Sequence, residues 1–368
     1  MFHPFELAFC GLSGSGKTTL LTRVLRHFRD AGYELGYFKH GCHRFDIDRE
    51  GKDSYLAREA GAVTVMISDP GKEAIISGGG TLSRNGALLH CDLLFIEGLK
   101  ELPTPKVLLV DAGEQILAHL ENGTVRNVVA LVHRGDDSRL GRFGLPTFHR
   151  DDLAAVTEFI GSRFRAQASA VPLYGLVLAG GISERMGTDK ARLNYGGKEQ
   201  LDATAALLAG RCAQLFVSCR REQACAYEGA GLPLVTDDYL GMGPLGGLLS
   251  AQRRHPEAAW LVAACDFPFL DAPTIEGLVG MRDPLRFATA YRLPGSEVPE
   301  PLCTIYEPKS RQPLLFGHAG GCDSLSAFLR HSRIALAGPA NPAALRNVND
   351  PDAMRAAMHE LNPGNAKC

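Results

Sequence analysis

Short apolar runs alternate with helical patterns along the first part of the chain. Between residues 17 and 29, apolar side chains recur at the three- and four-residue spacing of an amphipathic helix, and a second such pattern covers residues 152–164. Strands that alternate with helices predict a parallel sheet with crossover helices. Residues 69–90 are rich in glycine and match neither period. The predicted strands are 5–10, 34–40, 62–68, 92–98, 106–111 and 128–133.

A second alternating series follows the first. The segment between them, residues 165–172, is small and polar and ends in proline, which is typical of a linker. We therefore predict two domains, 1–166 and 173–368, joined by a linker at 167–172. Both should be doubly wound, Rossmann-like, three-layer α/β folds, which bind ligands at the carboxyl ends of their strands. Strands are predicted at 173–179, 214–219, 233–237 and 260–266, and helices at 200–211, 244–254 and 272–280.

Composition narrows the class of protein. The 368 residues include 39 Lys and Arg against 41 Asp and Glu, a net charge of -2, and 45% of them are hydrophobic. These values exclude a disordered chain and a strongly basic nucleic-acid binder. No run reaches the roughly 18 apolar residues of a membrane span, and the start does not resemble a secretory signal. We therefore expect a cytoplasmic protein with no membrane and no nucleic-acid partner.

Cysteine and histidine do not indicate a metal centre strongly. The ten cysteines are scattered without a C-x-x-C pair, which favours thiols in a reducing compartment. His40, Cys42 and His43 lie close together, but a structural zinc site would need a second ligand cluster. We therefore predict no zinc site.

The first candidate site is a phosphate-binding loop at residues 11–18, which read GLSGSGKT. This is a complete G-x-x-x-x-G-K-[ST] motif, and it lies between a predicted strand and a predicted helix, as the motif requires. Glycines let successive backbone N–H groups point at a phosphate, Lys17 neutralises β- and γ-oxygens, and the Thr18 hydroxyl ligates Mg²⁺. The predicted nucleotide-binding residues of this loop are Gly14, Gly16, Lys17, Thr18 and Thr19.

Carboxylates near this loop would be needed for a metal. Asp46, Asp48 and Asp53 follow the second predicted strand, and Glu97 ends the strand at 92–98. Glu97 stands where a Walker B acid polarises a metal-bound water, and the Gly98 amide could contact the γ-phosphate. No N-K-x-D sequence follows, so the residues of this half do not decide between guanine and adenine.

Three segments of the first half, GLSGSGKTTLL, YFKHGCHRFDIDREGKDSY and LLFIEGLK, resemble the MobB-type GTP-binding protein of molybdopterin guanine dinucleotide biosynthesis. The resemblance covers about residues 5–165. It implies a P-loop domain that binds GTP, hydrolyses it weakly and acts as a dimeric adaptor. It also implies Thr18, Asp48 and Glu97 as Mg²⁺ ligands, a homodimer through this domain, and molybdopterin-insertion proteins and molybdoenzymes as partners.

The second candidate site is the loop at residues 178–190, LAGGISERMGTDK, directly after a predicted strand. Its glycines allow close approach to a triphosphate, and Arg185 and Lys190 can neutralise charge on a leaving pyrophosphate. No Ser-His or Cys-His nucleophile pair is apparent, which favours group transfer over hydrolysis. Asp266 ends the apolar run at 260–265, and we predict it as a Mg²⁺ ligand.

Two further acids, Asp237 and Asp238, end another strand ahead of the Gly-rich turn GMGPLGG. One of them could face the nucleoside or the metal. For both, and for Asp266, the competing interpretation is a helix N-cap.

LAGGISERMGTDK, TDDYLGMGPLGGL and CDFPFL resemble the MobA-type molybdenum cofactor guanylyltransferase, over about residues 172–362. The resemblance implies a nucleotidyltransferase fold that transfers GMP from GTP to molybdenum-bound molybdopterin and releases pyrophosphate. Ser218 departs from the family, which often has Asn there. The implied site residues are Leu178, Ala179, Gly180 and Gly181 for guanine or ribose, Lys190 for phosphates, Asp237 for the nucleoside, Asp266 for Mg²⁺, and Asn347 and Asn349 on the pterin side.

Two other interpretations remain open at this point. The second half could be a cytidylyltransferase or a sugar-phosphate nucleotidyltransferase, although cytidylyltransferases usually read L-A-A-G where this chain reads L-A-G-G, which favours guanine. Alternatively, the first half could make the chain a GTP-regulated delivery scaffold with weak catalysis.

Overall fold

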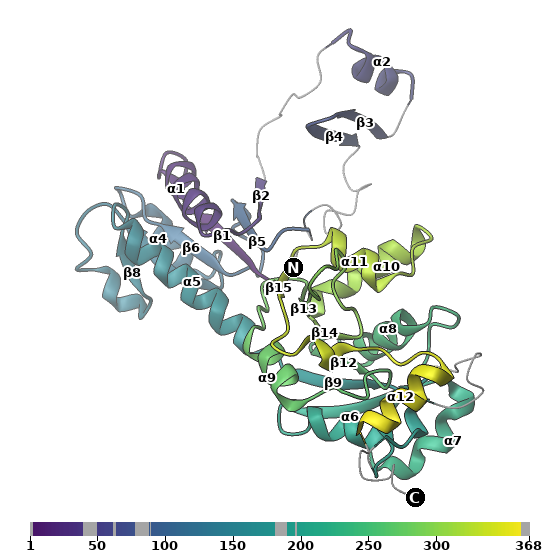
Figure 1. Cartoon of the computed structure of the whole chain (residues 1–368). Helices are drawn as coiled ribbons and strands as arrows, with labels where there is room; N and C mark the ends of the chain where they lie inside the picture. Colours follow the sequence, from purple (N-terminus) through teal and green to yellow (C-terminus); the bar gives the residue numbers. More distant parts are fainter. Residues whose placement is uncertain are drawn as a thin grey trace, which may run out of the picture. The chain divides into compact units, whose positions relative to one another are not determined.

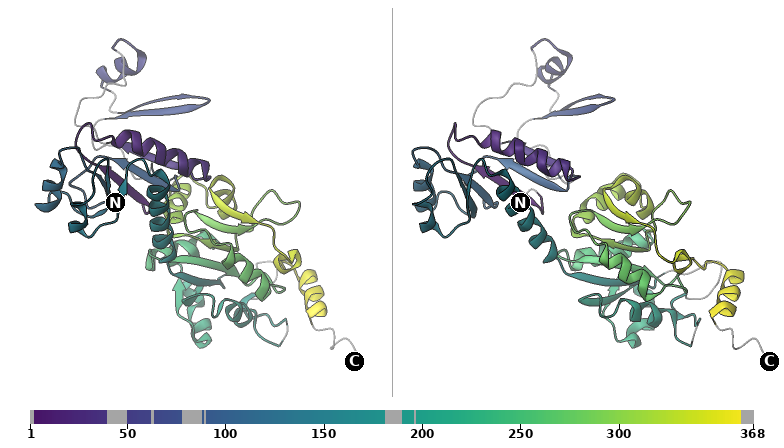
Figure 2. Two further views of the ribbon diagram at one scale, coloured as in Figure 1. Left: turned by 90° about the vertical axis from the view of Figure 1, so that its left-hand side faces the viewer. Right: turned by 60° about the vertical axis from the view of Figure 1, so that its left-hand side comes forward.

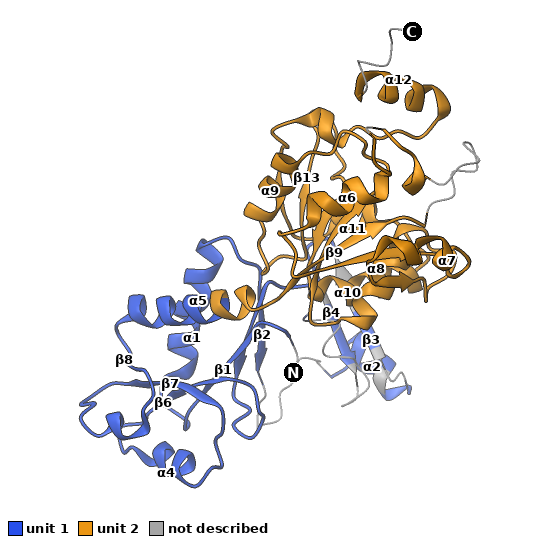
Figure 3. Cartoon of the chain, turned by 90° about the horizontal axis from the view of Figure 1, so that it is seen from below, with its two compact units in different colours: residues 1–164 blue, residues 165–368 orange. Residues whose placement is uncertain are grey.

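The computed structural model describes residues 3–39, 50–61, 64–77, 88, 90–180, 190–195 and 197–361. The chain divides into two compact units, Met1–Phe164 and Arg165–Cys368 (Figure 3). Within the described residues, no helix combines the length and the apolar character that a membrane crossing requires.

The first unit is built on a six-stranded sheet in the order β2-β5-β1-β6-β7-β8. Figure 1 shows this sheet with α1, α4 and α5. Every neighbouring pair in it is parallel. The central strands β1 and β5 are buried along their whole length, as expected for a parallel sheet covered on both faces. The strands are β1 (Glu6–Cys10), β2 (Leu35–Lys39), β5 (Leu93–Glu97), β6 (Lys106–Leu109), β7 (Val128–His133) and β8 (Thr147–His149).

Helices cover both faces of this sheet. On one face, Phe28 of α1 (Lys17–Asp30) and Phe164 of α5 (Leu153–Ser169) both pack against Phe95 of β5, with ring centroids 5.6 and 6.0 Å away. On the other face, α4 (Gln115–Glu121) buries its first apolar residues against β1, β5 and β6. Helix α1 lies along the strands of its sheet (Figure 2). The predicted α/β layering of the first half is confirmed.

The strand predicted at 62–68 does not join this sheet. Its residues form β3 (Thr64–Asp69), which pairs antiparallel with β4 (Lys72–Ser77) in a separate two-stranded sheet. The turn is Pro70-Gly71, because Asp69 pairs with Lys72 across it. A proline followed by glycine favours a tight reversal over a crossover helix. The helix α2 (Asp53–Glu59) precedes this hairpin.

The boundary between the units falls inside a helix. The division lies after Phe164, whereas α5 continues to Ser169, so the first three residues of the linker predicted at 167–172 are helical. Arg, Ala and Gln are good helix formers, and the helix ends before Pro172. The small, polar residues that predicted a linker thus form the last turn of α5 in part.

The second unit contains a seven-stranded sheet in the order β11-β10-β9-β12-β14-β13-β15. The first four are parallel, but β14 runs antiparallel to both β12 and β13. The predicted α/β fold class is confirmed, with β14 as an antiparallel strand between β12 and β13. The strands are β9 (Leu173–Leu178), β10 (Gln214–Cys219), β11 (Leu234–Thr236), β12 (Ala259–Ala264), β13 (Ala288–Tyr291), β14 (Cys303–Tyr306) and β15 (Ile334–Ala337).

Two apolar clusters lie on opposite faces of this sheet. One contains Val177 of β9 with side chains of α6 (Gln200–Leu208) and α9 (Ala272–Gly280). The other contains Leu176 and Trp260 with side chains of α8, α10 and α11. The three-layer prediction holds, and the predicted bounds of α8 and α9 are those observed. The remaining helices are α7 (Ala224–Tyr227), α8 (Pro244–Arg254), α10 (Arg311–Ala319), α11 (Leu325–His331) and α12 (Pro351–Leu361).

Candidate functional site

The phosphate loop joins β1 to α1 in the first unit. Gly14 and Gly16 have φ of 77° and 88°, in the left-handed region that glycine adopts without strain. Gly16 is also the N-cap of α1 and offers no side chain to the first-turn amides, which leaves them available to an anion. Lys17 Nζ donates to Leu12 O at 2.8 Å, and burial lowers the pKa of its ammonium. The Thr19 side chain is exposed in the same turn.

Thr18 and Glu97 come together beside this loop. Thr18 Oγ1 donates to Glu97 Oε1 at 2.9 Å, Tyr37 Oη donates to Oε2 at 2.9 Å, and Lys39 Nζ lies 3.4 Å from Oε1. Burial alone would raise the pKa of Glu97, but these three partners outweigh it and the pKa is lowered. Burial and the Glu97 carboxylate raise the pKa of Tyr37 to about 12. A hydroxyl and an ionised carboxylate in contact are oxygen donors of the kind Mg²⁺ prefers.

Gly98 is engaged differently from our expectation. Its amide, which was expected to be free for a γ-phosphate, donates to Phe9 O at 3.1 Å as part of the sheet. Its carbonyl accepts from Cys10 Sγ at 2.9 Å. The parallel ladder between β1 and β5 extends one residue beyond Glu97, and sequence patterning alone could not show this.

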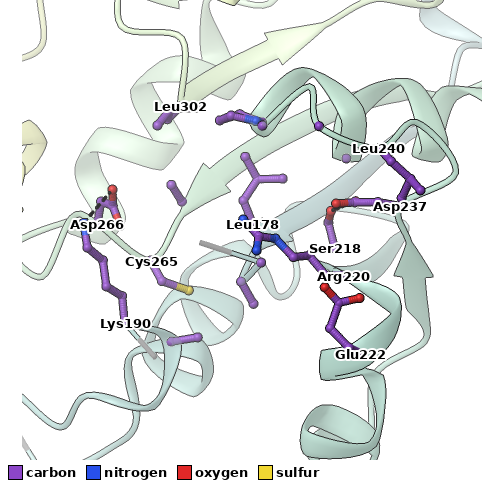
Figure 4. Close-up of a pocket in the computed structure, with 18 residues that line it drawn as sticks. Leu178, Lys190, Ser218, Arg220, Glu222, Asp237, Leu240, Cys265, Asp266 and Leu302 are labelled. Atoms are coloured by element: carbon purple, nitrogen blue, oxygen red, sulfur yellow. Dashed lines mark hydrogen bonds and ion pairs between the residues drawn. The ribbon is translucent and has the colours of Figure 1, made fainter. Parts of the chain in front are cut away.

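The second unit holds a cavity of about 640 Å³ at the carboxyl ends of β9, β10, β11 and β12 (Figure 4). The sheet order reverses at β9, so the cavity lies at the switch point where open α/β sheets bind ligands. Six residues singled out from the sequence line it: Leu178, Ala179, Gly180, Lys190, Asp237 and Asp266.

At one end of the cavity, three predicted residues meet. Lys190 Nζ lies 3.2 Å from Asp266 Oδ2 and donates to Asn349 Oδ1 at 2.7 Å. The amide of Val348 donates to Asp266 O at 3.0 Å, which docks the segment carrying Asn349. The side chain of Lys190 is 12% exposed and that of Asp266 is 27% exposed. Asn347, expected on the same side, is exposed.

Asp237 marks the other end of the cavity. Burial raises the pKa of its carboxyl to about 6, against the opposing effects of the Ser218 hydroxyl, 3.5 Å away, and of Arg220. Asp238 does not line the cavity: it lies 3.3 Å from Arg253 and its amide donates to Ser250. Of the two adjacent acids, Asp237 is therefore the one that faces the cavity.

The helix-capping interpretation of these acids is wrong. Helix α8 begins after Gly243, and the N-cap of α9 is Asp271, whose side chain accepts from the amide of Thr274. Neither Asp237, Asp238 nor Asp266 caps the helix that follows it. Asp237 and Asp266 line the cavity instead.

Two glycines in the first turn of α8 have a packing role. A Cβ on Gly246 would lie 2.4 Å from Tyr239 O, and one on Gly247 would lie 2.3 Å from Ser218 Oγ. These glycines let the helix approach the cavity wall closely.

Arg220, Glu222 and Leu240 also line the cavity and were missed, although Arg220 directly follows a predicted strand, a position that could have singled it out.

Several predicted residues lie outside the described part of the chain. They are Gly181, Arg185, Asp46, Asp48, His40, Cys42 and His43. Among the residues that are described, no three His, Cys, Asp or Glu side chains cluster as a metal site would require.

Residues 6–134 match the family described as molybdopterin guanine dinucleotide synthesis protein B, MobB, and residues 175–335 match the MobA-like NTP transferase domain. A molybdenum cofactor biosynthesis bifunctional protein of Synechocystis is 34% identical over 51% of this chain, and the match spans only 54% of that relative.

Two relatives of the separate halves match over nearly their full length. A Bacillus subtilis protein, named as a probable molybdopterin-guanine dinucleotide biosynthesis adapter protein, is 31% identical over 46% of this chain and 99% of its own length. A molybdenum cofactor guanylyltransferase of Cereibacter sphaeroides is 32% identical over 49% of this chain and 92% of its own. The chain therefore belongs to the MobB family in its first half and to the MobA-like nucleotidyltransferase family in its second half.

Proposed function

We propose that this chain is a bifunctional protein of molybdenum cofactor biosynthesis. Its second unit transfers GMP from GTP to molybdenum-bound molybdopterin, giving molybdopterin guanine dinucleotide and pyrophosphate. Its first unit binds GTP as an adaptor with weak hydrolysis. The observation that carries the transferase proposal is the meeting of Lys190, Asp266 and Asn349 at one end of a cavity whose other end holds Asp237. A nucleotide and an acceptor require such a two-ended site.

The reaction needs positioning more than acid–base chemistry. The terminal phosphate of the acceptor is already an anion, so no strong general base is required. One of its oxygens bonds to the α-phosphorus of GTP, while the bond from that phosphorus to the β-phosphate oxygen breaks and pyrophosphate leaves. Lys190, and Arg185 from outside the described residues, neutralise the charge on the phosphates, and Asp237 orients the nucleoside.

The donor sets fit Mg²⁺ at both sites. Asp266 presents a partly exposed carboxylate to the cavity, and Thr18 and Glu97 present adjacent oxygens beside the phosphate loop. When bound, Mg²⁺ would supply neutralisation of the triphosphate charge. Asn349 contacts Lys190 and follows the segment docked on Asp266, which supports an acceptor-side role for it.

We also propose a homodimer through the first unit. Three large apolar side chains of its α2, β3 and β4 region are exposed by about half: Leu56 by 53%, Met66 by 56% and Ile75 by 48%. A second copy would remove this apolar surface from water. Replacing Met66 and Ile75 by glutamate should shift the mass measured by analytical ultracentrifugation from dimer to monomer, and an unchanged dimer would contradict this interface.

Pyrophosphate release tests the transferase proposal directly. The full chain is given GTP, CTP or ATP, each with and without molybdenum-loaded molybdopterin. The proposal expects release with GTP that depends on the acceptor. Release with CTP in preference to GTP would identify a cytidylyltransferase, and release with a sugar phosphate in place of molybdopterin would identify a sugar nucleotidyltransferase.

A further inference from the structure

Two arginines reach the phosphate loop from the side opposite Glu97. Arg134 follows β7 and Arg150 follows β8, and because the sheet is parallel both emerge at the edge where the loop leaves β1. A Cβ placed on Gly16 would lie 2.5 Å from Arg150 Nη1 and 3.5 Å from Arg134 Nη2. The guanidinium of Arg150 thus lies against the loop backbone at a position that has no side chain.

The position of Arg150 is fixed by its own strand end. Its amide donates to His133 O at 2.7 Å, and the neighbouring His149 Nε2 donates to Arg134 O at 3.0 Å, so the ends of β7 and β8 are joined. The Asp151 carboxylate lies 3.9 Å from Arg150 Nε. The side chain is 17% exposed, and its aliphatic part is therefore largely covered.

One nitrogen of this guanidinium, Arg150 Nη1, is buried, and its N–H groups have no acceptor among the described residues. Ser15 Oγ within the loop is also buried without a hydrogen-bond partner in that part of the chain, on a residue that is 7% exposed. Buried donors without acceptors are rare, because leaving them unpaired costs free energy. Both lie at a loop whose amides already favour an anion. A ligand rich in acceptor oxygens would pair with them.

We infer that Arg150 is a phosphate-binding residue of the first unit, contacting the inner phosphates of the nucleotide that the loop holds. The inference rests on the proposed nucleotide binding at this loop. Glu97 and Thr18 lie on the β5 side of the loop and Arg150 on the β8 side, so the phosphate chain would run across the loop between them. Arginine suits this place because it stays charged and presents its donors in a rigid plane.

A site-resolved measurement in the full chain tests this. Hydrogen–deuterium exchange of the peptide covering residues 11–20 is followed against increasing GTP and, separately, against inorganic tripolyphosphate, which carries no base. Arg150→Met keeps the aliphatic stem and removes the donors, and it should raise the half-saturating concentration of both ligands about tenfold. Arg150→Lys should restore part of that loss. Arg29→Met, at the far end of α1 with a 67% exposed side chain, is the matched control and should change neither.

The outcomes separate this inference from the proposal beneath it. If the wild-type peptide gains no protection with GTP, nucleotide binding at the loop is wrong. If the wild type is protected and Arg150→Met is protected at the same concentrations, Arg150 does not bind phosphate. If Arg150→Met weakens the binding of GTP but not that of tripolyphosphate, the residue contacts the base and not the phosphates, which also overturns the inference. Unchanged exchange of the β1 and β7 peptides without ligand shows that the variant is folded.

Discussion

Lys17 and Lys190 are the two lysines expected to contact phosphate, and they have different partners. Lys17 donates to the neutral carbonyl of Leu12 in its own loop, whereas Lys190 pairs with the Asp266 carboxylate and the Asn349 amide oxygen. A lysine on a neutral carbonyl can turn to a phosphate without leaving a charge unpaired. Lys190 already holds an ion pair, so a phosphate at the second site would compete with Asp266 for its ammonium.

The acids of the two sites differ in the same way. Glu97 is 5% exposed and has three partners, Thr18, Tyr37 and Lys39, which keep it ionised in a fixed position. Asp266 is partly exposed, and its carboxylate pairs with Lys190 at the cavity. The first site thus holds its acid in place with three partners. The second presents a paired but partly exposed carboxylate to an open cavity.

The largest expected effect is on the rate of pyrophosphate release, which should depend on Lys190 and not on Lys17. Lys190→Ala should lower the rate of acceptor-dependent pyrophosphate release about 10²- to 10³-fold, because one preorganised donor to the developing charge is lost. Lys17→Ala should leave that rate within about twofold. Lys198→Ala, an exposed lysine of the same segment, is the control. A near-normal rate in Lys190→Ala would remove it from catalysis, and a collapse in Lys17→Ala would make the two sites one functional unit.

Binding at the first site should show the opposite dependence. Lys17→Ala should raise the GTP concentration that half-protects the peptide 11–20 by about 10- to 100-fold, the cost of a lost charged hydrogen bond. The exposed Lys52→Ala serves as its control. Lys190→Ala should not change this value. Equal effects of both lysines on this peptide would contradict the assignment of separate ligands to the two sites.

The central layers of both units were predictable because they obey simple periodicity. The predicted bounds of α8, α9 and β10 are those observed, since each is a single apolar stripe or run between clear turn residues. The β3–β4 hairpin and the antiparallel β14 were not predictable. Apolar runs do not report strand direction, and the pairing partner of a strand is decided by contacts far away in sequence.

The features of the sites also differ in how far the sequence predicts them. Glycines and lysines in a loop between a strand and a helix indicate phosphate binding by local geometry alone. Strand-terminal acids such as Asp266 are predictable because open α/β sheets bind ligands at the carboxyl ends of their strands. The contact between Lys190 and Asn349 joins residues 159 positions apart, and Arg150 meets Gly16 across the sheet. No local pattern could pair them. The hydrogen bond from the Gly98 amide to Phe9 O likewise depends on how β1 and β5 pair, which the local sequence does not show.

The pH dependence should come from the second site. Because burial raises the pKa of Asp237 to about 6, its carboxylate is mostly protonated at pH 5 and mostly ionised at pH 7. If the carboxylate orients the nucleoside, kcat/KM for GTP should rise about tenfold between these values. Asp237→Asn should have a lower and flatter profile. A profile of the same shape in the variant would assign the titration to another group.

The same residue predicts a stability effect of opposite sign. A carboxyl whose pKa is higher in the folded than in the unfolded state binds more protons when folded, so stability falls as pH rises from about 4 to 6. Above this window the wild type carries the full penalty of a buried charge. Asp237→Asn should therefore melt at a higher temperature than the wild type at pH 8, with little difference at pH 4. A lower melting temperature of the variant at pH 8 would show that the carboxylate has a stabilising partner.

The smallest expected effect concerns how firmly the first site holds its acid. Tyr37→Phe removes one hydrogen bond to Glu97 while Thr18 and Lys39 remain, so GTP protection of the peptide 11–20 should weaken about three- to fivefold, as expected for about 1 kcal/mol. The peptide covering residues 218–240 in the second unit provides an internal control, because its hydrogen exchange at each GTP concentration should be the same in the variant and the wild type. A loss as large as that of Lys17→Ala would mean that Glu97 depends on Tyr37 for its position. No loss would mean that Thr18 and Lys39 are enough to hold the Glu97 carboxylate in place. The difference between the fixed acid of the first site and the more exposed acid of the second would then depend on these two contacts.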